Sequence, residues 1–220
     1  MMYRRFGKRF LDVLIAGGGL IVLAPLMIPI AALIRWKLGS PIFFRHERPG
    51  LHGKLFNVLK FRTMSFARDE KGELLPGGQR LTGLGRILRG TSLDELPELI
   101  NVLKGEMSLV GPRPWPPRYL KWYTKEEMRR HDVRPGLTGY AQAYGRSHLE
   151  WDKRLALDLD YVDKISLLLD LKIMARTLIQ VVKREGTVQE DQVRVVPLDE
   201  WRTNKAQGNA NERSGKGPAK

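Results

Sequence analysis

The sequence predicts an α-dominated α+β protein with a monotopic architecture, in which a membrane helix enters a bilayer from one side. Three observations indicate this class: an uncharged apolar stretch containing two prolines, short apolar runs around turn residues, and long amphipathic segments. They predict, in order, an N-terminal re-entrant broken helix, a small β-hairpin and interfacial amphipathic helices. We expect a basic N-terminus with the membrane helix (1–40), a cytosolic domain (41–185) and a C-terminal extension (186–220).

The membrane helix is predicted from residues 13–34, which carry no charge and would extend about 33 Å as a helix, close to the hydrocarbon thickness of a bilayer. Pro25 and Pro29 interrupt it, and a proline inside a helix removes a hydrogen bond. Both ends of the segment are flanked by basic residues, namely Arg4, Arg5, Lys8, Arg9, Arg35 and Lys37. Because such flanks stay on the cytoplasmic side, we expect the segment to enter and leave on one face.

Residues 41–64 predict the β-hairpin, since short apolar and aromatic runs lie on either side of the turn signals Pro49-Gly50 and Gly53. The next residues, 65–80, are polar and contain glycine. This composition predicts a loop.

Three later segments are recognised by composition. Residues 115–130 combine tryptophan and tyrosine with arginine and lysine, which predicts an interfacial helix or a core helix with a solvated basic face. Residues 164–183 predict a long amphipathic helix that lies on a membrane or covers the core. Residues 206–220 lack aromatic and branched aliphatic side chains, so we expect disorder from about residue 206.

Charge restricts the partners of the chain. Its 38 lysines and arginines exceed its 24 acids, giving a net charge of +14, which indicates polyanionic partners such as nucleic acid, anionic lipid or phosphorylated substrates. The absence of cysteine excludes disulfides, thiolate metal sites and cysteine nucleophiles. The four histidines are scattered without metal-ligand spacing, which argues against a histidine zinc site.

Residues 91–114 hold the candidate acid site. Ser92 and Glu95 have the spacing of a capping box, and an apolar helical repeat follows until Gly105 ends it. The repeat comprises Leu93, Leu96, Leu99, Ile100 and Leu103, opposite Asp94, Glu98 and Asn101. Pro97 requires either a kink or a helix that begins later than Ser92. The polar face is consistent with simple solvation or with a site in which Asp94 is kept ionised by a helix start.

Arginines concentrate in loops beside glycine and proline. They are Arg86 and Arg89 in TGLGRILRG, Arg113 in GPRP, Arg134 in RPGLTGY and Arg146 in YGR. Guanidinium groups bind phosphate in a bidentate manner and glycine lets the backbone approach, so this pattern favours a diphosphate ligand. The chain lacks a complete dinucleotide fingerprint and a Walker A sequence, which argues against Rossmann and P-loop folds.

Several long motifs occur together in order along the chain. They are KRFLD (8–12), FRHERPG, KFRTM (60–64), SLDELPELINVLKGEMSLVGPRP, RPGLTGYAQAYGR (134–146) and LDLKI (169–173). On these motifs the chain resembles the monotopic polyprenyl-phosphate phosphoglycosyl transferases, the bacterial sugar transferase family, from about residue 8 to residue 177. The resemblance is to the small, catalytic-core form, with Ala24-Pro25 where Ser-Pro is often found and Tyr140 where tryptophan is common.

This resemblance implies an enzyme that transfers a sugar 1-phosphate from a UDP-sugar to polyprenyl (undecaprenyl) phosphate and releases UMP, the first membrane step of glycan assembly. Residues 41–185 would form the catalytic domain, at the cytoplasmic face of a bacterial inner membrane. Asp94 would be the nucleophile and would bind Mg²⁺, and Glu95 would assist. The residues expected to contact phosphate or nucleotide are Arg86, Arg113, Arg134 and Arg146, followed by Lys60 and Arg62. Asp12 and the basic N-terminal residues either pair structurally, which is favoured, or meet lipid headgroups.

The expected partners are the UDP-sugar, polyprenyl phosphate and membrane phospholipids, and no nucleic acid; the sequence indicates neither the sugar nor the oligomeric state. The alternative is a basic membrane-tethered nucleic-acid-binding or scaffold protein. A nucleic-acid binder would explain the net charge but leaves Asp94 and Glu95 without a role. A scaffold would explain the amphipathic segments but not the loop arginines.

Overall fold

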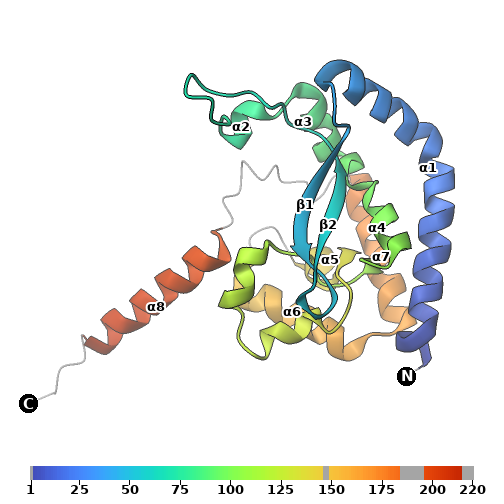
Figure 1. Ribbon diagram of the computed structural model, residues 1–220. Coiled ribbons are helices and arrows are strands. Elements are labelled where there is room, and N and C mark those ends of the chain that lie inside the picture. Colours follow the sequence, from blue (N-terminus) through green and yellow to red (C-terminus); the bar gives the residue numbers. More distant parts are fainter. Residues whose placement is uncertain (1, 146–148, 184–195, 215–220) are drawn as a thin grey trace, which may run out of the picture.

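The computed structural model describes residues 2–145, 149–183 and 196–214. Helices dominate, and two small two-stranded sheets lie among them (Figure 1). The α-helices are α1 (Lys8–Leu38), α2 (Gly77–Arg80), α3 (Gly83–Gly90), α4 (Glu98–Lys104), α5 (Tyr140–Tyr144), α6 (Trp151–Lys164), α7 (Leu167–Lys183) and α8 (Leu198–Ser214). The strands are β1 (Phe43–Pro49), β2 (Leu55–Phe61), β3 (Ser108–Val110) and β4 (Gly136–Thr138).

Helix α1 contains the predicted membrane segment, with Pro25 and Pro29 inside it. In Figure 1 it runs along one side of the body and then bends over it, as expected for a helix that loses backbone hydrogen bonds at proline. Its length and composition suffice to cross a membrane, and only 11% of its most apolar window is buried. The buried side chains of the helix lie toward its two ends: Asp12, Ala16, Ile30 and Ile34.

The predicted hairpin is present. Strands β1 and β2 pair antiparallel, with Phe43 opposite Phe61 and Pro49 opposite Leu55. A short 3₁₀ turn, Leu51–Gly53, joins them and contains His52 in a left-handed conformation at φ 55°. The predicted loop that follows β2 is largely irregular and contains only the single turn of α2.

A core connects these elements. Buried side chains from α1, β2, α4, β3 and α7 meet in one cluster, which includes Ala16, Val58, Leu99, Met107 and Ile173. Strands β3 and β4 form a short parallel pair within this region. Sequence patterns did not indicate this pair, because three residues are too few to show an alternation.

Residues 115–130 do not form the predicted amphipathic helix. They form two 3₁₀ segments, Pro117–Trp122 and Glu127–His131. The first segment ends before Tyr123, whose backbone is extended at φ −76° and ψ 138°. Tyr119 and Tyr123 do not lie on an interfacial face, since they are buried against α6 and α8.

The predicted helix at 164–183 is confirmed as α7, preceded by α6. Helix α7 covers the core with Ile173, which is fully buried, and exposes Leu168 and Leu178 on its outer face.

Helix α8 continues through Ser214, where composition predicted disorder from about residue 206. Leu198 is fully buried in the aromatic cluster, and a helix anchored at its start can propagate into a polar segment. Residues 215–220 lie outside the described residues.

Candidate functional site

The acid site begins at a turn between α3 and α4. Ser92 adopts a left-handed conformation at φ 55° and makes no side-chain capping bond, so the predicted capping box is wrong. A 3₁₀ turn, Leu93–Glu95, follows, and α4 begins at Glu98 directly after Pro97. The alternative in which the helix begins later than Ser92 is therefore confirmed. Gly105 ends α4 at φ 83°, as predicted.

Asn101 fixes α4 against the hairpin. Its Oδ1 accepts the N–H of Leu59 at 2.9 Å, and its Nδ2 donates to the carbonyl of Asn57 at 2.8 Å. These bonds satisfy edge groups of β2 that would otherwise need water or another strand. Because Glu98 is one helical turn before Asn101, the same contact brings Glu98 to Lys60 on β2.

The resulting cluster joins two acids and two cations from distant parts of the chain. Lys60 Nζ lies 2.5 Å from Glu95 Oε1 and 3.2 Å from Glu98 Oε1. Arg113 Nη2 lies 3.5 Å from the same Glu95 oxygen. The structure thus brings together three predicted site residues, Lys60, Glu95 and Arg113. It adds Glu98, whose only sequence signal was its place on the polar face with Asp94.

The pKa values of Glu95, Lys60 and Glu98 in this cluster, and of the adjacent Asp94, are shifted in different directions. Burial alone would raise the pKa of Glu95, but the charges of Arg113 and Lys60 outweigh it and lower this pKa. Burial opposes the charge of Lys60, yet Glu95 and Glu98 raise its pKa. The pKa of Asp94 is raised by burial and by the charge of Glu95, and the same two causes raise the pKa of Glu98 to about 7. The charges of Arg113 and Lys60 therefore favour the carboxylate form of Glu95, whereas burial and the charge of Glu95 disfavour the carboxylate form of Asp94.

Arg89 is the arginine of α3 that acts on Asp94. Its charge opposes the rise in the pKa of Asp94, and its Nε donates to Thr63 Oγ1 at 3.1 Å. Helix α3 packs closely against Thr63 because Gly85 has no side chain; a Cβ there would lie 1.9 Å from the Thr63 carbonyl oxygen. Arg86, predicted as a site residue, lies one turn before Arg89 on the same helix and is exposed.

A buried ion pair fixes the position of the loop that carries Arg113. Arg130 Nη2 donates to the carbonyl of Arg113 at 2.7 Å and also pairs with Asp158 at 2.7 Å. Both side chains of the pair are 2% exposed. Arg130 and Asp158 were not predicted, since their pairing depends on the packing of α6 against the 3₁₀ segment that contains Arg130.

Two predicted phosphate ligands lie elsewhere. Arg62 is buried and donates to the carbonyls of Leu38, Gly39 and Ser40, so it fastens the end of α1. The Nη atoms of Arg62 thus bind backbone carbonyls, and its predicted contact with phosphate stays a prediction. Arg134 donates from Nε to the carbonyl of Gly105 at 2.7 Å, at the opposite end of α4 from Glu98. It is therefore not part of the acid site. Arg146 lies outside the described residues.

The donor chemistry at Asp94 is compatible with Mg²⁺. Within the described residues no group of three or more histidine or acidic side chains has the spacing of a complete metal cage. Mg²⁺ usually needs less than a cage, because it keeps several waters and uses one or two carboxylates together with substrate phosphates. Burial and the charge of Glu95 raise the pKa of Asp94, and a bound cation would oppose both and favour its carboxylate form.

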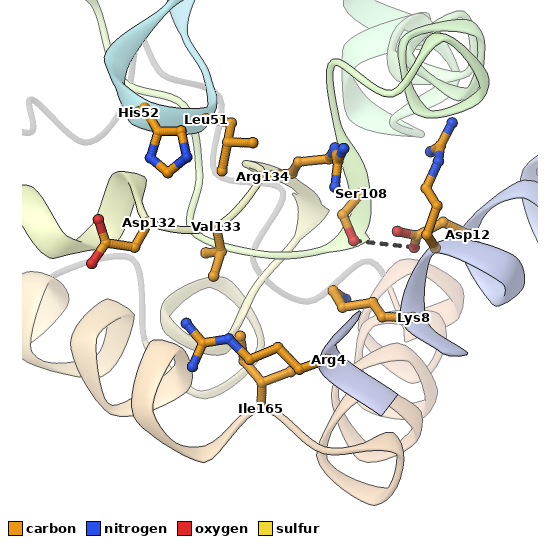
Figure 2. A pocket seen from close by; sticks show the side chains of 11 residues that line it. Arg4, Lys8, Asp12, Leu51, His52, Ser108, Asp132, Val133, Arg134 and Ile165 are labelled. Atoms are coloured by element: carbon orange, nitrogen blue, oxygen red, sulfur yellow. Dashed lines mark hydrogen bonds between the residues drawn. The ribbon is translucent and has the colours of Figure 1, made fainter. Parts of the chain in front are cut away.

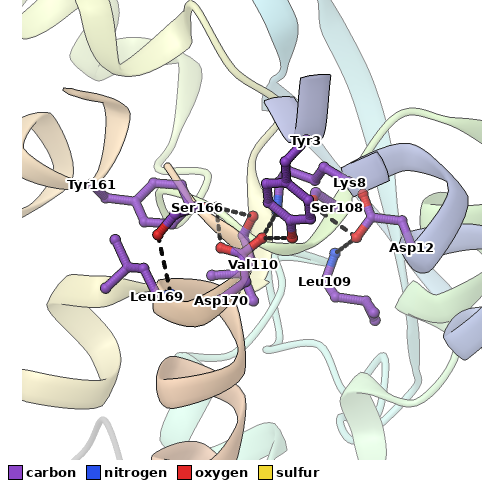
Figure 3. Close-up of polar contacts among 10 residues, drawn as sticks. All are labelled: Tyr3, Lys8, Asp12, Ser108, Leu109, Val110, Tyr161, Ser166, Leu169 and Asp170. Atoms are coloured by element: carbon purple, nitrogen blue, oxygen red, sulfur yellow. Dashed lines mark hydrogen bonds and ion pairs between the residues drawn. The ribbon is translucent and has the colours of Figure 1, made fainter. Parts of the chain in front are cut away.

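A second polar cluster lies at the other end of the core and joins α1, α6 and α7 (Figure 3). Asp170 accepts hydrogen bonds from Tyr3 at 2.5 Å, Lys8 at 2.7 Å and Tyr161 at 2.8 Å. Asp12 accepts from Ser108 Oγ at 3.1 Å and the N–H of Leu109 at 2.9 Å, which confirms its structural role.

Comparison with known proteins agrees with this arrangement. A family model described as bacterial sugar transferase matches residues 3–184. The chain is 50% identical over 186 residues to the uncharacterized sugar transferase EpsL of Bacillus subtilis, covering 84% of this chain and 92% of that protein. It is 43% identical over 180 residues to the UDP-glucose:undecaprenyl-phosphate glucose-1-phosphate transferase of Caulobacter vibrioides (77% and 67% covered). It is 38% identical over 197 residues to the exopolysaccharide production protein ExoY of Rhizobium meliloti (82% and 87% covered). As its motifs predicted, the chain belongs to the bacterial sugar transferase family.

Proposed function

We propose that this phosphoglycosyl transferase moves a sugar 1-phosphate from a UDP-sugar to polyprenyl phosphate through a covalent intermediate on Asp94. The observation that carries the proposal is the unequal state of the two adjacent acids. Both acceptor contacts of Glu95 are to cations, whereas Asp94 makes no ion pair with another side chain within the described residues. A nucleophile requires an accessible oxygen lone pair. Asp94 is therefore the better candidate.

In the first step an oxygen of Asp94 attacks the β-phosphorus of the donor. The bond from that phosphorus to the bridging oxygen breaks, UMP leaves with the bridging oxygen, and the sugar phosphate stays on the carboxylate. Arg113 and Lys60 lie beside the acids and would stabilise charge on the phosphoryl oxygens. In the second step a phosphate oxygen of the acceptor attacks the same phosphorus and releases Asp94.

Asp94, with substrate phosphates, would hold Mg²⁺ in this proposal. The bound ion would neutralise phosphoryl charge and favour the ionised form of Asp94. Glu95 would keep Lys60 and Arg113 at fixed positions beside the donor, because both cations are attached to the same Oε1.

The two steps can be separated by leaving out the lipid acceptor. Enzyme, Mg²⁺ and an accepted UDP-sugar should release up to one equivalent of UMP and leave the sugar phosphate on the peptide 91–104, which mass spectrometry detects. Asp94→Asn has almost the same volume but no nucleophilic carboxylate, so it should abolish both the adduct and turnover. Wild-type turnover without an adduct or a lipid-independent burst would indicate direct transfer, with Asp94 as a metal ligand only.

The donor must be identified first. UMP release from a panel of UDP-sugars, with undecaprenyl phosphate present, would do so. UDP-glucose is the first candidate because the relative from Caulobacter vibrioides carries that donor in its name.

We also propose that α1 is re-entrant, on the cytoplasmic face of a bacterial inner membrane. Both ends of α1 are fastened to the same body: Arg9 donates to the Val102 and Leu103 carbonyls near one end, and Arg62 donates to the Gly39 carbonyl at the other. A straight crossing would separate these ends by about 30 Å of hydrocarbon. The fastened ends therefore favour entry and exit on one face.

Labelling tests this topology cleanly because the chain has no cysteine. Single cysteines at Met2 and Lys37, both exposed, should be labelled from the same side of sealed vesicles. Labelling from opposite sides would establish a spanning helix. Pro25→Ala restores a helical hydrogen bond and should move a fraction of molecules toward spanning.

A further inference from the structure

A basic cavity lies at the C-terminal end of α4, beside the first turns of α1 (Figure 2). Its volume is about 240 Å³. In Figure 2 Arg134 and Arg4 lie on opposite sides of it. The charged side chains of its lining are Arg4, Lys8, Arg9, Arg134, Asp12 and Asp132, and His52 also lines it.

Backbone carbonyls, rather than carboxylates, hold the principal arginines of this cavity. Arg9 donates to the carbonyl of Val102 at 2.6 Å and to that of Leu103 at 2.8 Å, and Arg134 Nε donates to that of Gly105 at 2.7 Å. These carbonyls form the negative end of α4, which attracts cations without neutralising a full charge. Both guanidinium groups are thus oriented and still carry their charge.

The remaining charges of the lining leave the cavity positive. Lys8 is paired with Asp170, and Asp12 is satisfied by Ser108 and Leu109. Among the described residues Arg4 makes no hydrogen bond or ion pair, and neither Nη atom of Arg134 has a partner. A ligand would therefore meet three arginine charges against the carboxylates of Asp12 and Asp132, because the hydrogen bonds from Ser108 and Leu109 do not neutralise the charge of Asp12.

The cavity is separate from the acid site. Helix α4 lies between them, with Glu98 in the acid cluster at its start and Gly105 at the cavity end. A helix of this length extends about 10 Å. A phosphoryl group that reacts at Asp94 cannot occupy the cavity as well.

We propose that this cavity binds the phosphate ester headgroup of a membrane lipid. Arginine forks match phosphate oxygens, and 240 Å³ is smaller than a drug-sized site but accommodates a small headgroup. The cavity adjoins the first turns of α1, the helix that is long and apolar enough to cross a membrane. A phosphate bound there would lie where this helix enters a bilayer, at the level of the lipid headgroups. This position favours a lipid over free phosphate.

Thermal unfolding of the full-length protein in detergent, with calorimetric titration, tests this proposal. Dihexanoyl phosphatidylglycerol should raise the melting temperature in proportion to its occupancy, and inorganic phosphate should do so far less. Arg134→Gln and Arg4→Gln should each weaken lipid binding about tenfold, as expected for lost hydrogen bonds to a charged group. Arg4 has no partner to lose within the part of the chain that the structure describes, so its variant should fold normally. Arg118→Gln, with the same charge change outside the cavity lining, is the control and should bind as wild type.

The other outcomes are decisive. Equal binding of inorganic phosphate would retain a phosphate site but overturn its assignment to a lipid. Displacement of the lipid by UMP or a UDP-sugar would place the donor nucleotide in the cavity and overturn a separate site. Unchanged affinity in both variants would overturn the proposal altogether. None of these measurements requires turnover, so their result is independent of the reaction proposed at Asp94.

Discussion

The two ends of α4 differ in how the protein holds their charges. At the start, the carboxylates of Asp94, Glu95 and Glu98 gather beside Lys60 and Arg113, and the pKa values of Asp94 and Glu98 are raised by burial and by Glu95. At the end, Arg9 and Arg134 rest on backbone carbonyls. Helix polarity favours this distribution, since acids are stabilised at a helix start and cations at its end.

The comparison indicates which charges are available for chemistry. At the acid end Asp94 is buried, and burial together with the charge of Glu95 outweighs the charges of Lys60 and Arg89 and raises its pKa. At the basic end the buried carboxylates Asp12 and Asp170 accept hydrogen bonds from residues of β3, α1 and α6 and act as structural acceptors. Raised pKa values of Asp94 and Glu98 therefore mark the reactive end, while satisfied hydrogen bonds mark the end that fastens α1 to the body.

The largest expected effect is a loss of stability when Asp170, an acceptor at the end that fastens α1 to the body, is replaced. Asp170→Asn leaves Lys8, whose side chain is 12% exposed, without its counter-charge. Removing one partner of a buried pair costs about 3–5 kcal/mol, which would lower the melting temperature by about 6–20 °C. Thermal unfolding measures this shift. Asp160→Asn removes an exposed partner of Lys164 and serves as the control, with a change of less than about 1 kcal/mol.

The next effect concerns the reactive end. Arg113→Lys keeps the charge but loses the planar fork, so transition-state stabilisation should fall by about 1.5–3 kcal/mol. This corresponds to a loss of kcat/KM from roughly tenfold to over a hundredfold. Unchanged kinetics in a folded variant would mean that Arg113 does not contact the phosphates.

The free energy of unfolding should depend on pH through His131, which follows Arg130, the residue that holds the carbonyl of Arg113. Burial and the charge of Arg130 lower the pKa of His131 from its usual 6.5 to about 4. The unfolded chain binds this proton more readily, so the contribution is complete above pH 6.5 and is lost as pH falls toward 4. The free energy of unfolding should drop by about 2 kcal/mol between pH 7 and pH 5. His131→Asn should flatten this part of the profile, and an unchanged slope would assign it to other groups.

The smallest expected effect is a difference in activity between variants of Arg89 and Arg86, which both lie on α3. Arg89→Gln removes a charge near Asp94 and should lower activity about fivefold, equivalent to about 1 kcal/mol. Arg86→Gln makes the same change at an exposed position and should have a smaller effect. Steady-state UMP release measures both. The opposite order would indicate that the bound donor reaches Arg86.

The sequence by itself determined the features that depend on neighbours along the chain. The apolar stretch 13–34 predicted the long helix, the turn residues Pro49-Gly50 predicted the hairpin, and the helical repeat with Gly105 predicted α4 and its end. The motif around Asp94 indicated the family. Each of these signals is local, because helix and strand periodicities and turn preferences act over a few residues.

Tertiary structure alone decided which charged groups meet. Lys60 and Glu95 are 35 residues apart and pair only because Asn101 fixes α4 to β2. Arg62 and Arg134 resemble the other loop arginines in sequence, yet both bind backbone carbonyls. Residues 115–130 look amphipathic but bury their aromatic side chains against α6 and α8. The physical reason is that ion pairing and burial depend on distances through space, which local composition does not specify.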